Sequence, residues 1–383
     1  FATSSAVGSS QGALLVGDED GSNYKVVPFA KIAQALGIGA GSPQPLTLTV
    51  APTFPIVHPT IESDPVTSAA DAADDPAIWA NPDNPAASWV IGTDKQGGLH
   101  VYDMQGKSRF FAADGKMNNV DLRTGYRLAG RDVVLVTASD RTNKAIAIYS
   151  LDTATGSLTN IADGIQATGL SDPYGQCMYR SKRGRTYVFI SDPDGLVRQW
   201  ELIPTRAGKV QARQVRDIKF SSQTEGCVVD DANNTLYVAE EDIGLWRVTA
   251  DPVKSAVPVS IDKVDDNPKL KDDMEGVGLY DLGGGRGYLI VSSQGNNSYA
   301  VYRREGDNAY VGSFSVIADP AKGIDGISET DGLDVSSANL GPGFEQGAMI
   351  AQDGRNMLPV ENQNFKFVPW AIIAKSLNLE SRH

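Results

Sequence analysis

Residues 71–79 read DAADDPAIW, with three aspartates within five positions and an apolar segment directly after them. The apolar segment has the composition of a buried strand, so the carboxylates stand where that strand begins. A polar or acidic cluster followed by a short apolar strand occurs five more times along the chain. The later clusters are NNVDL (118–122), DPYGQCM (172–178), TEGCVV (224–229), MEGVGL (274–279) and TDGLDV (330–335).

The six clusters recur at a nearly constant interval. One anchor residue per cluster gives intervals of 44, 55, 51, 50 and 56 residues, a mean of about 51, and six units fill residues 62–372. Repeats of this length with several short strands each are typical of β-propellers. The sequence therefore predicts an all-β fold, a six-bladed β-propeller of four-stranded antiparallel blades with short terminal helices. The anchors are Asp75, Asn119, Tyr174, Glu225, Glu275 and Asp331.

A second polar cluster follows the second strand of each unit, as in WVIGTDKQ (89–96) and LYVAEEDIG (236–244). In an antiparallel meander the start of the first strand and the turn after the second strand lie at the same end. Both clusters of every blade are thus expected on one face. Any single cluster can be explained as ordinary turn residues. Glu and Gln, however, are poor turn formers, and they recur in these clusters. Their recurrence favours a functional role for this face.

Composition excludes several classes of function. The net charge of −13 over 383 residues argues against nucleic-acid binding, and no apolar run is long enough to span a membrane. The three histidines are scattered, so a histidine-based metal site or catalytic triad is not expected. The chain begins at Phe1 without a leader, and we expect a processed chain whose signal peptide has been removed.

The predicted face is rich in oxygen ligands for a metal ion. Crowded carboxylates raise one another's pKa or bind a cation. Oxygen ligands without His or Cys indicate calcium or magnesium, and calcium suits better because it accepts irregular shells of oxygens from separate loops. The acidic and amide residues of this face are Asp74, Asp75, Asn119, Asp121, Glu225, Glu240, Glu241, Asp273, Glu275, Gln294, Asp331, Gln352 and Asp353.

Lys95, Arg141 and Tyr174 stand among these acids. A cation cluster bordered by Lys and Arg suits a substrate with several phosphates, because metal ions bridge the acidic wall to the anion and Arg binds phosphate oxygens in pairs. For Lys95 or Arg141 alone, a surface salt bridge is the simpler explanation, but this setting favours substrate binding.

From about residue 64 to 378 the chain resembles the β-propeller phytases, the calcium-dependent alkaline phytases of bacteria. The segments that carry the resemblance include DAADDPAIW, NNVD, SQTEG (222–226), AEED (239–242), SSQGN (292–296), ETDGLDV (329–335) and NQNFKFVPW (362–370). The resemblance implies a secreted or periplasmic enzyme that hydrolyses phytate, myo-inositol hexakisphosphate, presented as a calcium complex. It implies a water molecule activated by calcium and no phospho-enzyme.

The resemblance also implies roles for individual residues. Asp74, Glu225, Glu275 and Asp331 are the implied catalytic residues. Lys95, Arg141, Tyr174 and Asp194 are the implied substrate-binding residues. The implied active-site calcium ligands are Asp74, Glu225, Glu241, Asp273, Glu275, Gln294 and Asp331, with Asn119 and Asp121 nearby, and the implied ligands of structural calcium ions are Asp75, Asp325 and Asp353.

One position departs from the resemblance. Where the family type has a lysine and then a glutamate in the turn of the third blade, this chain has Pro193 and Asp194. The acid is kept and the lysine is absent. We expect weaker substrate binding or a substitute cation from elsewhere in the chain.

Cys177 and Cys227 fall on the first strands of neighbouring blades. A disulfide and two buried thiols are both compatible with this placement, and buried thiols are the simpler interpretation.

The two ends of the chain resemble each other. NYKVVPF (23–29) parallels NFKFVPW (364–370), and an amphipathic segment follows each. We interpret residues 1–37 as a fragment resembling the tail of a preceding phytase-like domain, residues 38–61 as a linker, and residues 62–383 as the propeller. About 35 residues cannot bury a core alone, so the fragment is expected to dock on its own propeller or on a neighbouring molecule. A native extension that merely imitates the tail is the alternative.

Two other functions fit a propeller. A calcium-dependent lactonase or esterase would use fewer ions and usually a histidine base, which the clusters lack. A non-catalytic binding propeller would not need so many inward carboxylates. Release of phosphate from phytate, with calcium and after chelation, separates these functions.

Overall fold

The computed structural model describes residues 2–3, 13–18, 23–36, 54–264 and 269–382. Contacts divide the chain into two units, Phe1–Thr53 and Phe54–His383. Within the described residues no helix is long and apolar enough to cross a membrane.

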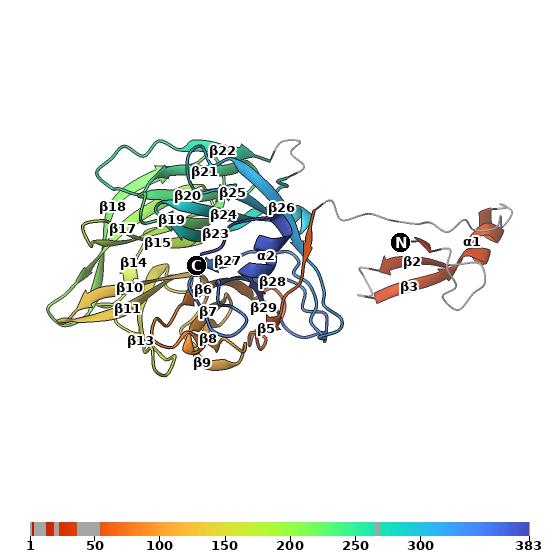
Figure 1. Cartoon of the computed structure of the whole chain (residues 1–383), viewed down its shortest axis with the longest axis horizontal. Coiled ribbons are helices and arrows are strands. Elements are labelled where there is room, and N and C mark those ends of the chain that lie inside the picture. Colours follow the sequence, from red (N-terminus) through yellow and green to blue (C-terminus); the bar gives the residue numbers. More distant parts are fainter. Residues whose placement is uncertain (1, 4–12, 19–22, 37–53, 265–268, 383) are drawn as a thin grey trace. The chain divides into compact units, whose positions relative to one another are not determined.

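The second unit is a six-bladed propeller, as predicted, with the first strand of every blade nearest its centre (Figure 1). The first three blades are β6 (Ala73–Trp79), β7 (Trp89–Asp94), β8 (Gly98–Asp103) and β9 (Ser108–Ala112); β10 (Met117–Leu128), β11 (Arg131–Asp140), β12 (Ala145–Leu151) and β13 (Leu158–Asn160), with β14 (Gln166–Ala167) also paired to β12; and β15 (Gln176–Arg180), β16 (Thr186–Ser191), β17 (Leu196–Pro204) and β18 (Val210–Lys219).

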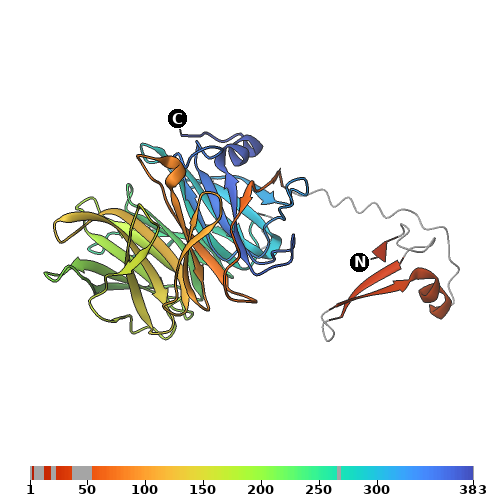
Figure 2. The same ribbon diagram turned by 90° about the horizontal axis from the view of Figure 1, so that it is seen from below.

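The last three blades are β19 (Thr224–Asp230), β20 (Thr235–Glu240), β21 (Gly244–Thr249) and β22 (Val259–Lys263); β23 (Met274–Gly283), β24 (Arg286–Ser293), β25 (Ser298–Arg303) and β26 (Tyr310–Val316); and β27 (Leu333–Ser336), β28 (Ala348–Asp353) and β29 (Asn364–Pro369). Short 3₁₀ turns occupy Pro85–Ala87 and Gln294–Asn296. The final helix α2 (Trp370–Leu377) follows β29 directly and lies outside the strands (Figure 2).

Two short strands before the first blade complete the ring. β5 (Ile61–Glu62) pairs antiparallel with β29 and supplies the fourth strand of blade six, and β4 (Ile56–Val57) pairs parallel with β26 of blade five. Residues 54–61, which the prediction assigns to the linker, lie in the propeller unit that starts at Phe54. Residues 37–53 lie outside the described part of the chain.

The core consists of six apolar clusters, each between two neighbouring blades. Ile91 and Val136 share one of them, and Met178 and Leu135 share the next. The middle strands of the blades are buried on both faces, so they read as continuous apolar runs such as YVFIS and YLIVS rather than as alternating patterns. Packing each sheet against its neighbours fixes the inner strands, which carry the polar clusters.

The first unit is a three-stranded sheet followed by a helix. It contains β1 (Ala2–Thr3), β2 (Ala13–Asp18), β3 (Asn23–Pro28) and α1 (Phe29–Leu36), with strand order β1-β2-β3.

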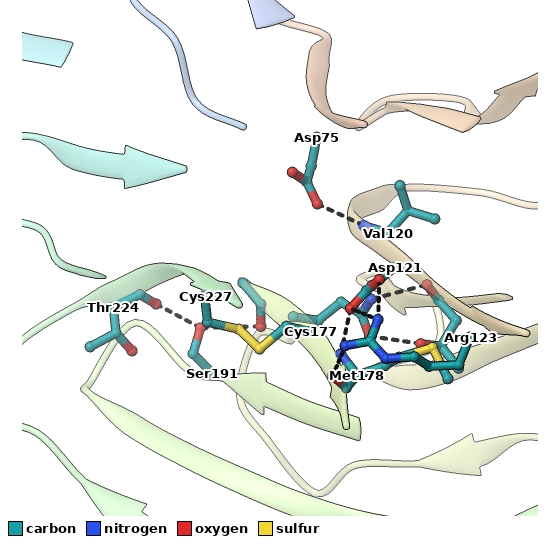
Figure 3. The surroundings of a disulfide bond; sticks show 12 residues. Asp75, Val120, Asp121, Arg123, Cys177, Met178, Ser191, Thr224 and Cys227 are labelled. Atoms are coloured by element: carbon teal, nitrogen blue, oxygen red, sulfur yellow. Dashed lines mark hydrogen bonds and ion pairs between the residues drawn. A yellow bond between two sulfur atoms is a disulfide. The ribbon is translucent and has the colours of Figure 1, made fainter. Parts of the chain in front are cut away.

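Cys177 and Cys227 form a disulfide between the inner strands β15 and β19 (Figure 3). The interpretation as buried thiols was wrong. The two strands are neighbours in the ring, and the two Cα atoms are 5.8 Å apart, a normal separation for a disulfide.

Candidate functional site

The polar clusters of the inner strands sit on β-bulges. In β6 the pairing moves from Ala73–Asp94 to Pro76–Gly92, so one extra residue stands on β6, where Asp74 and Asp75 lie. A bulge bends its strand and re-aims the extra side chain. The equivalent shift occurs at Asn118–Asn119 in β10, at Glu225–Gly226 in β19 and at Glu275–Gly276 in β23. Four inner strands therefore turn polar side chains toward one another at the same level.

Glycines next to these residues let neighbouring inner strands approach closely. A Cβ on Gly226 would lie 2.0 Å from the carbonyl oxygen of Glu275, and a Cβ on Gly175 would lie 1.9 Å from that of Glu225. No other residue type fits these positions without moving backbone. The close approach brings the side chains of successive blades into one cluster.

Glu225, Glu241 and Glu275 form the centre of this cluster. Each carboxylate has an oxygen within 4.8 Å of an oxygen from the other two, and all three side chains are buried. Glu241 Oε1, Glu275 Oε2 and Asp74 Oδ1 have no hydrogen-bond partner within the described residues. Buried carboxylate oxygens without partners are costly unless a cation binds them, so this donor set fits a hard divalent metal.

The pKa values of the clustered carboxyl groups also fit a metal site. Burial raises the pKa of Glu225 to about 7, and the charge of Asp331 adds to the effect. Burial also raises the pKa of Glu241 to about 7. The pKa values of Glu275 and Asp74 lie well above their usual range because both groups are buried and face Glu225. Without a cation, these carboxyl groups therefore lose their protons only at a higher pH than exposed carboxyl groups do.

Lys95 extends from the turn after β7 into the acids. Its ammonium nitrogen lies 2.9 Å from Asp71, 2.9 Å from Asp331 and 3.2 Å from Asp74. Burial opposes its charge, yet Asp74 and Asp331 hold the pKa of Lys95 above its usual value. Lys95 therefore stays charged.

Arg141 lies beside the cluster, in the turn after β11. Its guanidinium group donates to both carboxylate oxygens of Asp172, at 2.9 and 2.5 Å, and to Asn118 Oδ1 at 3.0 Å. Asn118 Nδ2 in turn donates to Glu225 Oε1 at 2.6 Å. The guanidinium carbon lies 5.7 Å from the ring centre of Tyr174. Burial, together with Glu225 and Glu275, raises the pKa of Tyr174, so its phenol remains a hydrogen-bond donor.

Gln294 and Asp273 complete this side of the site. Gln294 Nε2 donates to Asp331 Oδ1 at 2.7 Å, and the backbone carbonyl of Asp273 accepts the N–H of Gln294 at 2.9 Å. Burial raises the pKa of Asp273, and Asp242 adds to the effect.

An open cavity of about 660 Å³ lies over the cluster, within the size range of small-molecule sites. Lys95, Tyr174, Glu225, Glu275 and Asp331 line it, and the loop of residues 354–363 lines it too.

Three predicted ligands, Asp75, Asn119 and Asp121, line a smaller cavity of about 210 Å³ bounded by the inner strands. Asp75 Oδ2 accepts the N–H of Val120 at 3.1 Å, a bond drawn in Figure 3. Asn119 Oδ1 accepts a bond from Asn118 at 2.9 Å. Arg123 Nη1 donates to both carboxylate oxygens of Asp121, at 2.9 and 3.0 Å, so an arginine already balances the charge of this carboxylate. The backbone N–H of Met178 also donates to Asp121 Oδ2, at 2.7 Å.

Asp325 and Asp353, the two other predicted ligands of structural calcium ions, lie close together, and both contact the same lysine. The buried ammonium of Lys366 lies 2.6 Å from Asp325 and 3.3 Å from Asp353. Burial raises the pKa of Asp353 although Lys366 counteracts it. Asp353 accepts the N–H of Arg355, and Asp325 accepts the N–H of Met357. Asn356 stands between these two residues in the sequence, and its buried Oδ1 has no hydrogen-bond partner in the described part of the chain.

Asp194 and Glu240, two further residues of the polar clusters, contact groups outside the carboxylate cluster. Asp194 is exposed, and Lys219 Nζ lies 2.6 Å from its carbonyl oxygen and 3.2 Å from its carboxylate. Glu240 Oε1 accepts bonds from the N–H groups of Ser221 and Ser222, both at 2.8 Å, so it holds a loop rather than joining the carboxylate cluster.

Sequence reasoning missed Asn118, Gln223 and Asn356. Gln223 Nε2 donates to Glu241 Oε2 at 2.9 Å and orients that carboxylate. Asn118 was within NNVDL, but only the bulge tells which of the two asparagines faces Glu225.

A family model described as Phytase matches residues 48–382. The chain belongs to the phytase family. It is 42% identical over 323 residues to the 3-phytase of Bacillus subtilis strain 168, covering 82% of this chain and 84% of that protein. Among solved structures, regucalcin from Agrobacterium tumefaciens, described as a calcium-binding protein, matches with a TM-score of 0.51 and 14% identity over 82% of this chain and 95% of that one. That level of identity supports the propeller fold alone.

Proposed function

We propose that this phytase-family chain releases phosphate from phytate, and that calcium is its metal. The observation that carries the proposal is the set of buried carboxylate oxygens of Asp74, Glu241 and Glu275 that have no hydrogen-bond partner among the described residues. Lys95 lies beside Asp74, and Lys95 and Glu275 both line the cavity of about 660 Å³. An acidic wall alone would repel a polyphosphate, so the cluster needs a cation before it accepts this substrate.

The proposed ligands of the active-site ions are Glu225, Glu241, Glu275, Asp74 and Asp331, with Gln294 and Asp273 at the edge. When bound, calcium would neutralise phosphate charge and make a water molecule more acidic, so that it attacks phosphorus. Asp74, Glu225 and Glu275 stand on the inner strands β6, β19 and β23, which are packed between neighbouring sheets, and this rigid support keeps their oxygens in place during the reaction.

The chain's own cations would hold the phosphate groups. Arg141 already binds Asp172 through two parallel donors, and phosphate oxygens offer the same paired acceptors. Tyr174 remains protonated and can donate to a second phosphate oxygen. Lys95 would exchange one of its carboxylate partners for a phosphate.

Lys219 would replace the absent lysine at Pro193. Its ammonium group lies against the Pro193–Asp194 turn, from the last residue of β18. If Lys219 contributes, Lys219→Ala should raise KM for phytate at fixed calcium. If the missing lysine weakens binding instead, Pro193→Lys should lower KM, and Lys219→Ala should leave KM unchanged.

The test of the function is phosphate release from phytate across a calcium titration, after chelation, and with magnesium instead. We expect release only with calcium. Glu225→Gln should abolish it, while Asp64→Asn, which changes an acid paired with Lys107 away from the cluster, should not. Absence of release at every calcium concentration would overturn the proposal, and equal release with magnesium would overturn the choice of metal.

We also propose that the protein works outside the cytosol, secreted or periplasmic. The disulfide between Cys177 and Cys227 supports this, because such bonds persist in oxidising compartments. Detection of the native protein only in a cytosolic fraction would contradict it.

A further inference from the structure

The first unit repeats the end of blade six element for element. β2, β3 and α1 contain six, six and eight residues, as do β28, β29 and α2. In both places the helix begins at the residue after the second strand. The loop between the strands differs in length, but the strands and the helix do not.

The strand register is also the same. β2 and β3 pair from Ala13–Pro28 to Asp18–Asn23, and β28 and β29 pair from Ala348–Pro369 to Asp353–Asn364. β1 follows the same rule, because Thr3 pairs with Ala13 as Ser336 of β27 pairs with Ala348. β1, β2, β3 and α1 therefore match the stretch from the end of β27 through α2.

The sequences of β3 and α1 are also similar to those of β29 and α2. NYKVVP and NFKFVP share four of six residues, and FAKIAQAL and WAIIAKSL share four of eight. Ala33 of α1 is buried, as Ala374 of α2 is.

The first unit lacks the partners that blade six has. The outer edge of β29 carries β5, through bonds from Thr60 N to Phe367 O at 2.9 Å and from Ser63 N to Phe365 O at 2.8 Å. β3 is the edge of its sheet in the described residues. Val26 is 56% exposed, whereas Phe367 at the equivalent position is fully buried. A small sheet with an apolar edge strand is marginal by itself and invites strand pairing.

We infer that β1, β2, β3 and α1 are the closing part of the sixth blade of a second propeller of the same family. This propeller is the partner that covers the outer edge of β3, with an antiparallel strand equivalent to β5, and the exposed face that includes Val26. In the propeller of residues 54–382, β28, β29 and β5 already fill the sixth blade.

A graft tests whether this segment closes a propeller of this family. In the full chain, residues 348–353 are replaced by residues 13–18 and residues 364–377 by residues 23–36, while the loop 354–363 is kept. We expect a cooperative, calcium-stabilised thermal transition, lowered by about 10–20 °C because smaller side chains such as Val replace Phe367.

The matched control grafts the same sequence shifted by one residue, residues 14–19 and 24–37. A one-residue shift turns every side chain of a strand to the other face, so this variant should show no cooperative transition. Equal behaviour of the two grafts, whether both fold or both fail, would overturn the inference.

Hydrogen exchange on the unaltered chain gives a second test. The amide of Val26 should exchange almost freely, while the amide of Phe367, on the edge covered by β5, should be protected at least about 10³-fold. Strong protection of Val26 in this chain would show that its edge is already covered, and it would overturn the inference.

Discussion

The ammonium nitrogen of Lys95 lies 2.9 Å from a carboxylate oxygen of Asp331, one of the acids that we propose as calcium ligands. The same lysine contacts Asp71 and Asp74. Lys95 therefore competes with a metal ion for the acids while it offers a charge to phosphate, and removal of Lys95 should affect these two roles in opposite directions.

Lys95→Ala should lower kcat/KM for phytate by about 10²-fold, because one charged donor to the reacting phosphate is lost. The same variant should bind calcium more tightly, since a competing positive charge has left the acids. Calcium titration followed by melting temperature and steady-state kinetics measure the two effects. Lys107→Ala, which removes an exposed lysine paired with Asp64, is the control. A parallel loss of calcium affinity and activity would contradict this dual role.

Calcium binding should release protons near pH 6. The pKa values of Glu225 and Glu241 are about 7 without a cation, above the ordinary value of 4.5, because both are buried. A calcium ligand must be deprotonated, so calcium binding displaces these protons. Calorimetry in buffers of different ionisation enthalpy should give about one or more protons per molecule at pH 6 and far fewer at pH 9. Glu225→Gln should reduce the number.

The same groups set the pH dependence of stability. A carboxyl group whose pKa is higher in the folded state stabilises the fold when protonated. For Glu225 and Glu241 this contribution is complete below about pH 4.5 and is lost as the pH rises through about 7. As the pH rises from 5 to 8, the calcium-free melting temperature should therefore fall because of these two groups. The increase in melting temperature that calcium causes should become larger over the same pH range. A calcium effect independent of pH would contradict this assignment.

The sequence predicted the propeller because each blade repeats one pattern, and Asp74, Glu225 and Glu275 lie near the starts of inner strands, where that pattern put them. It could not predict β4 and β5, since strands of two residues leave no pattern. The neutralisation of Asp121 was detectable in principle. Arg123 stands two residues later on the same strand, and residues two apart share a face. The disulfide depends on how neighbouring blades meet, which no local pattern records.

Asp74 and Asp75 are adjacent in sequence but should serve different purposes. Asp74 joins the carboxylate cluster, whereas Asp75 accepts the N–H of Val120 near the centre of the ring and thereby links blades one and two. Asp74→Asn should reduce phytate hydrolysis by at least about 10³-fold with little change in melting temperature. Asp75→Asn should retain much of the activity and lose several degrees of calcium-dependent stability. Equal effects on stability would remove the distinction.

The disulfide should stabilise the propeller by joining blades three and four. Cys177 and Cys227 are separated by 50 residues, and closing such a loop restricts the unfolded chain by up to about 4 kcal/mol. The double variant Cys177→Ala/Cys227→Ala should melt at a lower temperature and keep kcat/KM at temperatures well below the transition. Reduction of the unaltered protein should shift its melting temperature in the same direction, whereas the double variant should not respond to reductant.

Two truncations should separate the N-terminal unit from the propeller. Removal of residues 1–53 should leave calcium-dependent phosphate release and the main melting transition nearly unchanged, because the propeller unit begins at Phe54. Removal of residues 1–62 also deletes β4 and β5, exposing the edges of β26 and β29 and leaving Lys366 without Glu62, which lies 2.8 Å away. That variant should lose several kcal/mol of stability, since a buried charge then lacks one of its partners. Equal melting temperatures for the two truncations would show that β5 does not stabilise the closed ring.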